Sequence, residues 1–546
     1  MGSAATGRSW AWEEKSARCR GILARSLNQD RLPPPTQRNV LGFIESCGAL
    51  SARELEITAR DGRGLVAEMA AGRLSAVETT TAFLKRAHVA HQLVNLATEF
   101  LVEDALRAAR ELDAHFAATG RLKGPLHGLP VSVKEHIALK GRIVHSSYVA
   151  LADNVMEEDA LIITLARNAG AVIHVRTNIP QTVMMIDCAN PIYGETVNPH
   201  NRDLTPGGSS GAEGASLGLR CAALGLGTDT GGSVRVPAAF CGAYGIKTTS
   251  LRNPYGGITL PGLARRASAA SGCCTTSPTP HPPVTRALKK AVAAAKAAGF
   301  DMVDWEPHEH ERCLDILKDL YFPDAAATQR DLLAEGGEPI PAITRWTLET
   351  APAKPLSLAE TWALNLRRDG YRDAHYRLMR ERGVDAILCP AYVGAAAVCG
   401  TGQHIMYTAM WNILDYPSVT FQTGVSVDPA VDVVDAAYKP RSAHDEAEQR
   451  KYVPETFAKA PIALQLDRKR YQDETNTRKT PQPPGRLQAL AESIGPARPA
   501  AAPSEDRNCP RSPGGRTEQA SIHNAHTNTC PPERLGWQRG AGVAAT

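Results

Sequence analysis

The sequence predicts an α/β fold in which a β-sheet is covered by helices on both faces. Short apolar segments alternate with helical segments from Gly124 onward, and this alternation is typical of a sheet with helices packed on its two sides. The chain of 546 residues is 43% hydrophobic and 22% charged, as in globular proteins that bury a large core.

The N-terminal region is predicted to be helical. Residues 1–44 form a loosely attached arm whose charged, Ala-rich helix covers Trp10–Arg25. Residues 51–120 follow as further helices, and there Ser75 and Glu78 have the spacing of a capping box, in which each side chain bonds the backbone N–H of the other residue. A second helix in this region ends at a glycine and has one apolar face. Its residues are Leu106, Ala109, Leu112 and Phe116, followed by Gly120.

The strands of the sheet are expected at six short apolar runs, because runs of this length bounded by turn residues are typical of buried strands. They are Val131–Val133, Ala171–Val175, Ala222–Leu226, Ala386–Leu388, Ser418–Phe421 and Pro461–Leu466. Helices are expected between them at Ala160–Asn168 and Val284–Ala298.

Two stretches lack the periodicity of either helix or strand. Residues 258–285 carry two adjacent cysteines and a Ser/Thr/Pro-rich run, and residues 473–546 are rich in Pro, Arg, Gly and Asn. Because such a composition cannot bury an apolar face, we expect 473–546 to be a disordered tail. The predicted organisation is therefore a helical arm over 1–44, a main domain over 45–472 and this tail.

Charge and composition exclude several classes of partner. The chain has 61 Lys and Arg against 57 Asp and Glu, and 5% aromatic residues, so no nucleic-acid surface is expected. It has no apolar leader and no long apolar run, so we expect no stable membrane insertion. Gly2 and Thr6 match a short myristoylation pattern that chance often produces. Twelve cysteines without a CxxC pair favour a reduced, cytoplasmic protein.

The clearest candidates for a catalytic site are two serine clusters, each of which follows a pair of glycines. The clusters are Gly207-Gly208-Ser209-Ser210-Gly211 and Gly231-Gly232-Ser233. Glycine lets the backbone approach a ligand and turn its N–H groups inward, as an oxyanion hole requires. A phosphate-binding loop is excluded because no lysine follows either cluster, and a dinucleotide fingerprint is excluded because Thr230 stands in place of its third glycine.

Lys134 is a third candidate for a catalytic role, beside the two serine clusters. In the segment 129–134 the apolar Val131 and Val133 alternate with Ser132 and Lys134, which is the period of a strand. On a central strand covered on both faces, Lys134 is buried, and burial makes its neutral amine available as a base. Taken alone, a surface lysine at a strand end is the simpler interpretation, because unpaired lysine is rarely buried.

Together these segments resemble the amidase signature family. The resemblance rests on HGLPVSVKEH (127–136), PGGSSGAEGA (206–215) and GLGTDTGGSVRVPAAFCGAYGIK (225–247). It covers residues 45–257 well and 286–470 more loosely. The form with Glu213 is most similar to the fungal-type acetamidases and the related fatty-acid amide hydrolases. The resemblance implies the amidase-signature fold, a central mixed β-sheet with helices on both faces.

The family's catalytic groups fall on named residues of this chain. The resemblance implies a Ser–cis-Ser–Lys triad in which Ser233 is the nucleophile, Ser209 follows a cis peptide bond and Lys134 is the base. The oxyanion hole is implied to consist of the backbone N–H groups of Thr230, Gly231, Gly232 and Ser233. We expect Ser210 to hydrogen-bond within the site.

Other polar residues near these motifs have structural interpretations. We expect Asp229 and Arg235 to order the loop, since arginine cannot act as a base. Cys241 lies in an apolar stretch and is expected to be inert. Neither a metal nor a cofactor is expected, because three nearby histidines are spaced unlike any zinc motif. They are His127, His136 and His145.

The function that the resemblance implies is amide hydrolysis. We expect small, acetamide-like carboxamides to be cleaved to carboxylate and ammonia through an acyl-enzyme on the serine nucleophile. Two alternatives are a hydrolase of longer, fatty-acid amides and an idle, binding-only protein. A transamidase subunit acting on charged tRNA is disfavoured, because Glu213 replaces the small residues of that branch. The sequence is also compatible with a homodimer.

The chain departs from the family pattern at three points. Ala212 stands where glycine is usual, and the segment after Tyr255 is shorter than in the family. The closing helix expected near 467–470 gives way to the tail. These departures motivate a further alternative, in which the chain is a catalytically impaired amidase-like protein.

Overall fold

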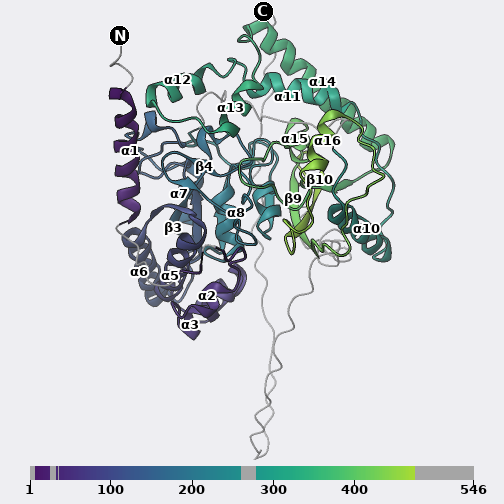
Figure 1. The fold of residues 1–546 in the computed structure, drawn as a ribbon. Helices are drawn as coiled ribbons and strands as arrows, with labels where there is room; N and C mark the ends of the chain where they lie inside the picture. Colours follow the sequence, from purple (N-terminus) through teal and green to yellow (C-terminus); the bar gives the residue numbers. More distant parts are fainter. Residues whose placement is uncertain (1–5, 25–31, 35, 260–277, 474–546) are drawn as a thin grey trace, which may run out of the picture. The chain divides into compact units, whose positions relative to one another are not determined.

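The computed structural model describes residues 6–24, 32–34, 36–259 and 278–473, and Figure 1 shows its elements. The helices are α1 (Thr6–Ala24), α2 (Phe43–Ser46), α3 (Ala52–Ala59), α4 (Gly62–Ala70), α5 (Ala76–Val94), α6 (Val102–Thr119), α7 (Leu161–Asn168), α8 (Gly211–Gly218), α9 (Arg235–Phe240), α10 (Pro282–Ala297), α11 (His310–Tyr321), α12 (Ala327–Gly336), α13 (Ala342–Glu349), α14 (Leu358–Glu381), α15 (Met406–Ile413) and α16 (Ala443–Arg450), with the 3-10 turns η1 (Val149–Leu151) and η2 (Gln181–Val183). The strands are β1 (Ala97–Phe100), β2 (Pro130–Lys134), β3 (Val172–Thr177), β4 (Ala189–Asn190), β5 (Gly194–Glu195), β6 (Leu224–Leu226), β7 (Gly245–Lys247), β8 (Ala386–Pro390), β9 (Ser418–Ser426) and β10 (Pro461–Arg468).

The first sheet is mixed and has the strand order β1-β3-β2-β6. Strands β3, β2 and β6 run parallel, whereas β1 pairs with β3 in the antiparallel sense. Ile163 and Ala166 of α7 cover the face that carries Val131 and Val133. The other face of β2 lies against α8, because Ser132 bonds a side chain of that helix. The sheet is thus covered on both faces, as predicted.

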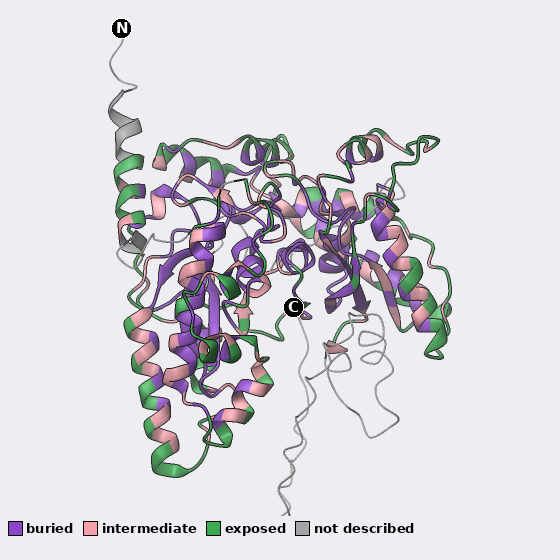
Figure 2. Cartoon of the chain, turned by 60° about the horizontal axis from the view of Figure 1, so that its bottom comes forward, coloured by how far each residue is buried: buried purple, intermediate pink, exposed green. Residues whose placement is uncertain are grey.

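The second sheet is antiparallel, with the order β7-β9-β10-β8. Helices α9 and α10 pack against it. The described strands therefore divide between two four-stranded sheets and one two-stranded ribbon, β4-β5. The predicted α/β class with a mixed sheet is confirmed. Figure 2 shows the buried residues concentrated on these strands and the inner faces of their helices.

Two details of the predicted N-terminal helices are wrong. Residues 97–100 form strand β1, although they lie within the stretch predicted to be helical, because four residues are too few to show strand alternation. The Ser75 side chain does accept from the backbone of Glu78, but the capping box is incomplete. The Glu78 carboxylate accepts from Arg53 Nε at 2.9 Å instead. The end of α6 at Gly120 is as predicted, with a left-handed φ of 64°.

The predicted arm and irregular segments are described only in part. Helix α1 buries Ser16 and Cys19, so it is packed against the domain rather than loosely attached. The sequence between 260 and 277, the tail from 474 and Gly2 lie outside the described residues. Helix α10 begins at Pro282, inside the stretch predicted to be irregular, because prolines suit the first turn of a helix.

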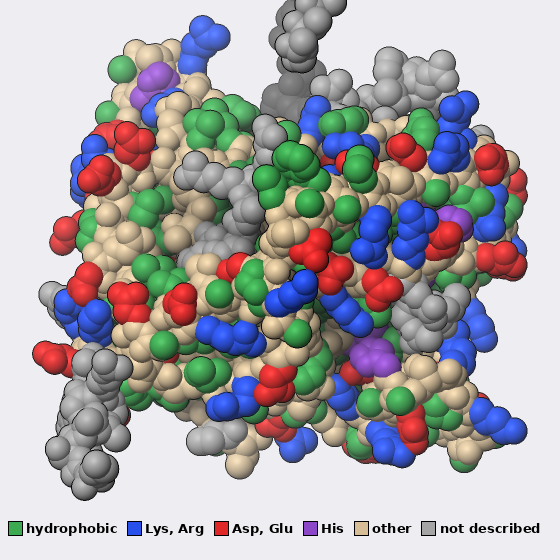
Figure 3. Space-filling view, turned by 90° about the horizontal axis from the view of Figure 1, so that it is seen from above, with side chains coloured by type: hydrophobic (Ala, Val, Ile, Leu, Met, Phe, Trp, Pro, Cys, Tyr) green, Lys and Arg blue, Asp and Glu red, His purple; other side chains and the backbone are tan. Residues whose placement is uncertain are grey.

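Two observations concern nucleic-acid and membrane partners: the charges on the surface and the length and composition of the helices. On the face seen in Figure 3, Lys and Arg side chains lie interspersed with Asp and Glu side chains. In the ranges that the structure describes, no helix is both long enough and apolar enough to cross a bilayer.

Candidate active site

Strand β2 places Lys134 in the interior of the protein. The lysine is 0% exposed, and its Nζ donates to Ser209 Oγ at 2.7 Å and to Thr228 Oγ1 at 3.0 Å. The buried position predicted for a central strand is therefore the one observed. Burial lowers the pKa of Lys134 to about 7, although Cys188, Asp229 and Glu213 act in the opposite direction. A neutral amine is thus accessible near neutral pH.

The two serine clusters lie side by side. The Gly208–Ser209 peptide bond is cis, and a Cβ on Gly208 would lie 2.2 Å from Asp187 O, so only glycine fits there. Ser210 N donates to Ser233 O at 3.0 Å. Its hydroxyl donates to Thr228 O at 3.2 Å, as expected of a residue that bonds within the site.

The loop that carries Ser233 connects β6 to α9. Gly232 N donates to Asp229 Oδ1 at 2.9 Å, so its predicted place in the oxyanion hole is wrong: the carboxylate beside it already accepts that hydrogen. Among the residues that the structure describes, the N–H groups of Thr230, Gly231 and Ser233 have no protein acceptor. These three groups are the ones that remain for an oxyanion.

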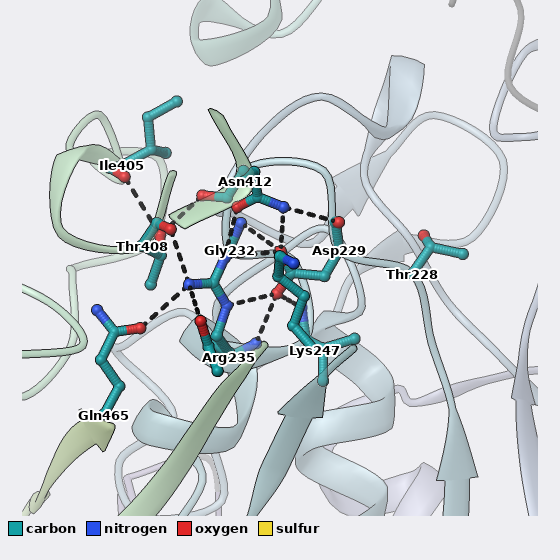
Figure 4. A network of polar contacts seen from close by, with 12 residues as sticks. Thr228, Asp229, Gly232, Arg235, Lys247, Ile405, Thr408, Asn412 and Gln465 are labelled. Atoms are coloured by element: carbon teal, nitrogen blue, oxygen red, sulfur yellow. Dashed lines mark hydrogen bonds and ion pairs between the residues drawn. The ribbon is translucent and has the colours of Figure 1, made fainter. Parts of the chain in front are cut away.

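A buried ion pair holds this loop, as Figure 4 shows. Arg235 donates through Nε to Asp229 Oδ2 at 3.0 Å and through Nη2 to Oδ1 at 2.9 Å. Its Nη1 reaches Thr408 O of α15 at 2.7 Å and Gln465 Oε1 of β10 at 3.1 Å. Asn412 Nδ2 donates to Asp229 Oδ1 at 3.0 Å. The loop is thereby tied to elements far along the chain.

The electrostatics of this pair follow from its partners. Burial by itself raises the pKa of Asp229, but the Arg235 guanidinium and the Asn412 amide hold that pKa well below its usual range. Asp229 is therefore an ionised acceptor for Gly232 N and Val234 N. These contacts are of the kind expected for residues that order the loop.

Sequence reasoning missed two polar neighbours of the lysine. Thr228 Oγ1, which accepts from Lys134, also lies 2.9 Å from His136 Nε2. Glu213 is buried on α8 and accepts from hydroxyls on β2 and β3. The available signal was the strand alternation, which puts Ser132 on the same face as Lys134, but the sequence does not reveal which helix covers that face.

The residues given structural interpretations have no catalytic contacts. Cys241 is buried, its Sγ lies 3.4 Å from Pro206 O, and burial raises its pKa well above the usual value, so the thiol is unreactive. Within the described ranges, no group of three His, Cys, Asp or Glu side chains has the arrangement of a metal site.

Known proteins share this fold and these motifs. A family model described as Amidase matches residues 78–276 and 270–476. The acetamidase of Emericella nidulans is 32% identical, over 89% of this chain and 98% of its own length. An amidase-family protein of Schizosaccharomyces pombe is 37% identical, over 83% of this chain and 94% of its own. A solved fatty acid amide hydrolase superposes with a TM-score of 0.83 at 31% identity, covering 89% of this chain and 96% of that structure.

These matches and the site geometry define a hydrolase that acts on amides. The chain belongs to the amidase family.

Proposed function

We propose that this amidase hydrolyses small primary carboxamides, of which acetamide is the model, through Ser233, Ser209 and Lys134. The observation that carries the proposal is the 2.7 Å contact between Lys134 Nζ and Ser209 Oγ, two side chains that are 0% and 1% exposed. A lysine desolvated in this way is a base at neutral pH, and a serine nucleophile needs such a base.

The reaction divides into acylation and deacylation. Lys134 takes the proton of Ser209 while Ser209 takes that of Ser233, and Ser233 Oγ attacks the amide carbonyl. The oxyanion forms against the N–H groups of Thr230, Gly231 and Ser233. The C–N bond then breaks as the relay returns the proton to nitrogen, and ammonia leaves. Water repeats the attack on the acyl-enzyme to release the carboxylate.

The curated relatives support a small acyl group. The acetamidases of Emericella nidulans and Aspergillus oryzae are each 32% identical to this chain and align with 89% of it. Acetamide is the small primary carboxamide from which these relatives take their name.

The second candidate is a hydrolase of long-chain amides. The TM-score of 0.83 to a fatty acid amide hydrolase favours it. Ammonia release by the purified full chain from acetamide, hexanamide and dodecanamide separates the two candidates. We expect kcat/KM to fall as the acyl chain lengthens.

Three other results of this assay have distinct meanings. A rise in kcat/KM with chain length would establish the long-chain alternative. Activity that survives Ser233→Ala would refute the assigned nucleophile. No ammonia from any of the three amides would support the catalytically impaired alternative.

A further inference from the structure

Glu213 is a buried carboxylate that the proposed reaction does not use. It bonds Ser132, which lies two residues before Lys134 on the same face of β2. Glu213 stands in the first turn of α8, and its side chain faces β2. Its Oε2 accepts from Ser132 Oγ at 2.5 Å, and its Oε1 accepts from Thr177 Oγ1 at 2.6 Å. Thr177 is the residue that pairs with Lys134 between β2 and β3. The carboxylate is therefore anchored to the immediate neighbours of Lys134.

The sheet is shaped to accept this carboxylate. Gly225 of β6 pairs with Ser132, and a Cβ on Gly225 would lie 2.4 Å from Glu213 Oε2. Any other residue at this position would displace the carboxylate. Both hydroxyl partners donate, and two donated hydrogen bonds favour the ionised carboxylate over the neutral acid. These two bonds therefore oppose the effect of burial, which favours the neutral acid.

The other ionisable groups around Lys134 cannot take the same part. Burial raises the pKa of Cys188 to about 12, so this thiol is neutral. Burial lowers the pKa of His136 well below its usual value, so this ring is neutral too. Asp229 is already neutralised by Arg235. Among the residues that the structure describes, no cationic side chain bonds Glu213 directly, so Glu213 is left as the source of negative charge near Lys134.

We propose that Glu213 is a positioning residue whose negative charge stabilises Lys134 in its protonated form, and so assists the transfer of a proton through Ser209. The inference rests on the proposed function, in which Lys134 is the base. In the reactive state Lys134 is neutral and Glu213 is ionised. The attack of Ser233 moves one proton onto Lys134 and converts the site into an ion pair, and breakage of the C–N bond returns that proton to the leaving nitrogen. Glu213 gains and loses no proton in the cycle.

Burial raises the pKa of Glu213 to about 7, whereas the two hydroxyl bonds and Lys134 oppose that rise. This coupling between carboxylate and amine predicts the sign of the test. Without the negative charge, protonated Lys134 becomes less stable, so Lys134 becomes a weaker base that stays neutral to a lower pH.

The experiment compares Glu213→Gln with wild type in the full chain. Two quantities are measured against pH: kcat/KM for acetamide, and the rate at which a fluorophosphonate probe labels Ser233. The labelling step forms the Ser233 O–P bond, breaks the P–F bond and releases fluoride, and the serine proton passes to Lys134. In Glu213→Gln we expect the acid midpoint to move down by about one pH unit and the alkaline plateau to fall about tenfold.

Matched variants separate this role from a structural one. Glu338→Gln alters another buried carboxyl, which accepts from Val149 N, and it should leave the midpoint in place. Glu213→Asp keeps the charge but retracts it, so its midpoint should lie between those of wild type and Glu213→Gln. Should Glu213→Gln not fold, Glu213→Asp still reports through its smaller downward shift.

Each contrary outcome has a distinct meaning. An unmoved midpoint in Glu213→Gln, with or without loss of activity, overturns the inference, and so does an unmoved midpoint in Glu213→Asp if only that variant folds. Normal activity of Lys134→Ala would overturn the proposed function and this inference together. An inactive Lys134→Ala beside an unaltered Glu213→Gln would overturn this inference alone.

Discussion

The proposed nucleophile and base can be tested one residue at a time. Ser233→Ala and Lys134→Ala should each lower kcat/KM by a factor of about 10³ or more, because removal of one member of a catalytic unit disables the whole unit. Ammonia release measures the loss, and urea unfolding followed by circular dichroism verifies the fold.

A matched control for the nucleophile lies on α8. Ser216 is also buried, and its hydroxyl has no hydrogen-bond partner among the described residues. Ser216→Ala should therefore retain activity. Retention of normal turnover by Ser233→Ala or Lys134→Ala would contradict the assignment.

The pH dependence follows from the buried lysine. Only the neutral amine accepts a proton, and burial lowers the pKa of Lys134 to about 7. Activity should thus rise with pH through 7, and below that value kcat/KM should fall about tenfold per pH unit as the lysine becomes protonated. A stopped assay of ammonia from acetamide between pH 5 and 9 measures the profile. A flat profile, or one that declines from pH 6 to 8, would contradict a neutral lysine base.

At the scale of elements, the loop from β6 to α9 is held by the Arg235 side chain, which bonds Asp229, Thr408 and Gln465. Arg235→Met would leave the Asp229 carboxylate buried without its cation, a change that costs about 3–5 kcal/mol. Arg235→Lys keeps the charge but loses the paired donors, so it should lie between wild type and Arg235→Met. Urea unfolding measures both variants. A loss below about 1 kcal/mol for Arg235→Met would show that the pair contributes little.

The order and spacing of the motifs located the site, but the contacts between residues far apart in the sequence could not be deduced from the motifs. Lys134 and Ser209 were assigned from two segments 75 residues apart and are found in contact. Gly232 was assigned to the oxyanion hole from the family resemblance, but the sequence does not show that the Asp229 carboxylate turns back to accept the N–H of Gly232. In the sequence, Glu213 served only to distinguish one form of the family motif from another. Its contacts could not be predicted, because they depend on which helix packs against β2.

Element prediction missed strands β1 and β7. Strand β1 has four residues and β7 has three, and neither stands in an apolar run like the one that revealed the equally short β6. Their pairing partners lie far away in the sequence, β3 for β1 and β9 for β7. Longer strands with a clear apolar pattern, such as β10, were found. The division of the strands into two sheets depends on these long-range pairings. Local periodicity in the sequence does not record it, so it could not be predicted.

At the scale of the whole molecule, proteolysis tests the predicted organisation. Of the stretch 258–285, the part from Pro282 belongs to α10 and buries Pro283 and Val284. The rest of that stretch and residues 473–546 lack the apolar periodicity needed to bury a face, and unburied segments cannot offset about 1–2 kcal/mol of backbone entropy per residue. Dilute trypsin should therefore cut first in these stretches and leave protected fragments that contain Lys134 and Ser233. Mass spectrometry of the early fragments identifies the sites. Early cleavage within 125–245 would show that the predicted boundaries are wrong.

The reach of Arg235 also has a consequence for synthesis on the ribosome. Its partner Gln465 is encoded 230 residues later, and at about 5–20 residues per second this distance takes on the order of tens of seconds to translate. All three residues of the proposed triad have emerged by then, but the loop that bears Ser233 still lacks its contacts to α15 and β10. We therefore expect the nascent chain to lack activity until β10 has been synthesised and Gln465 can bind Arg235.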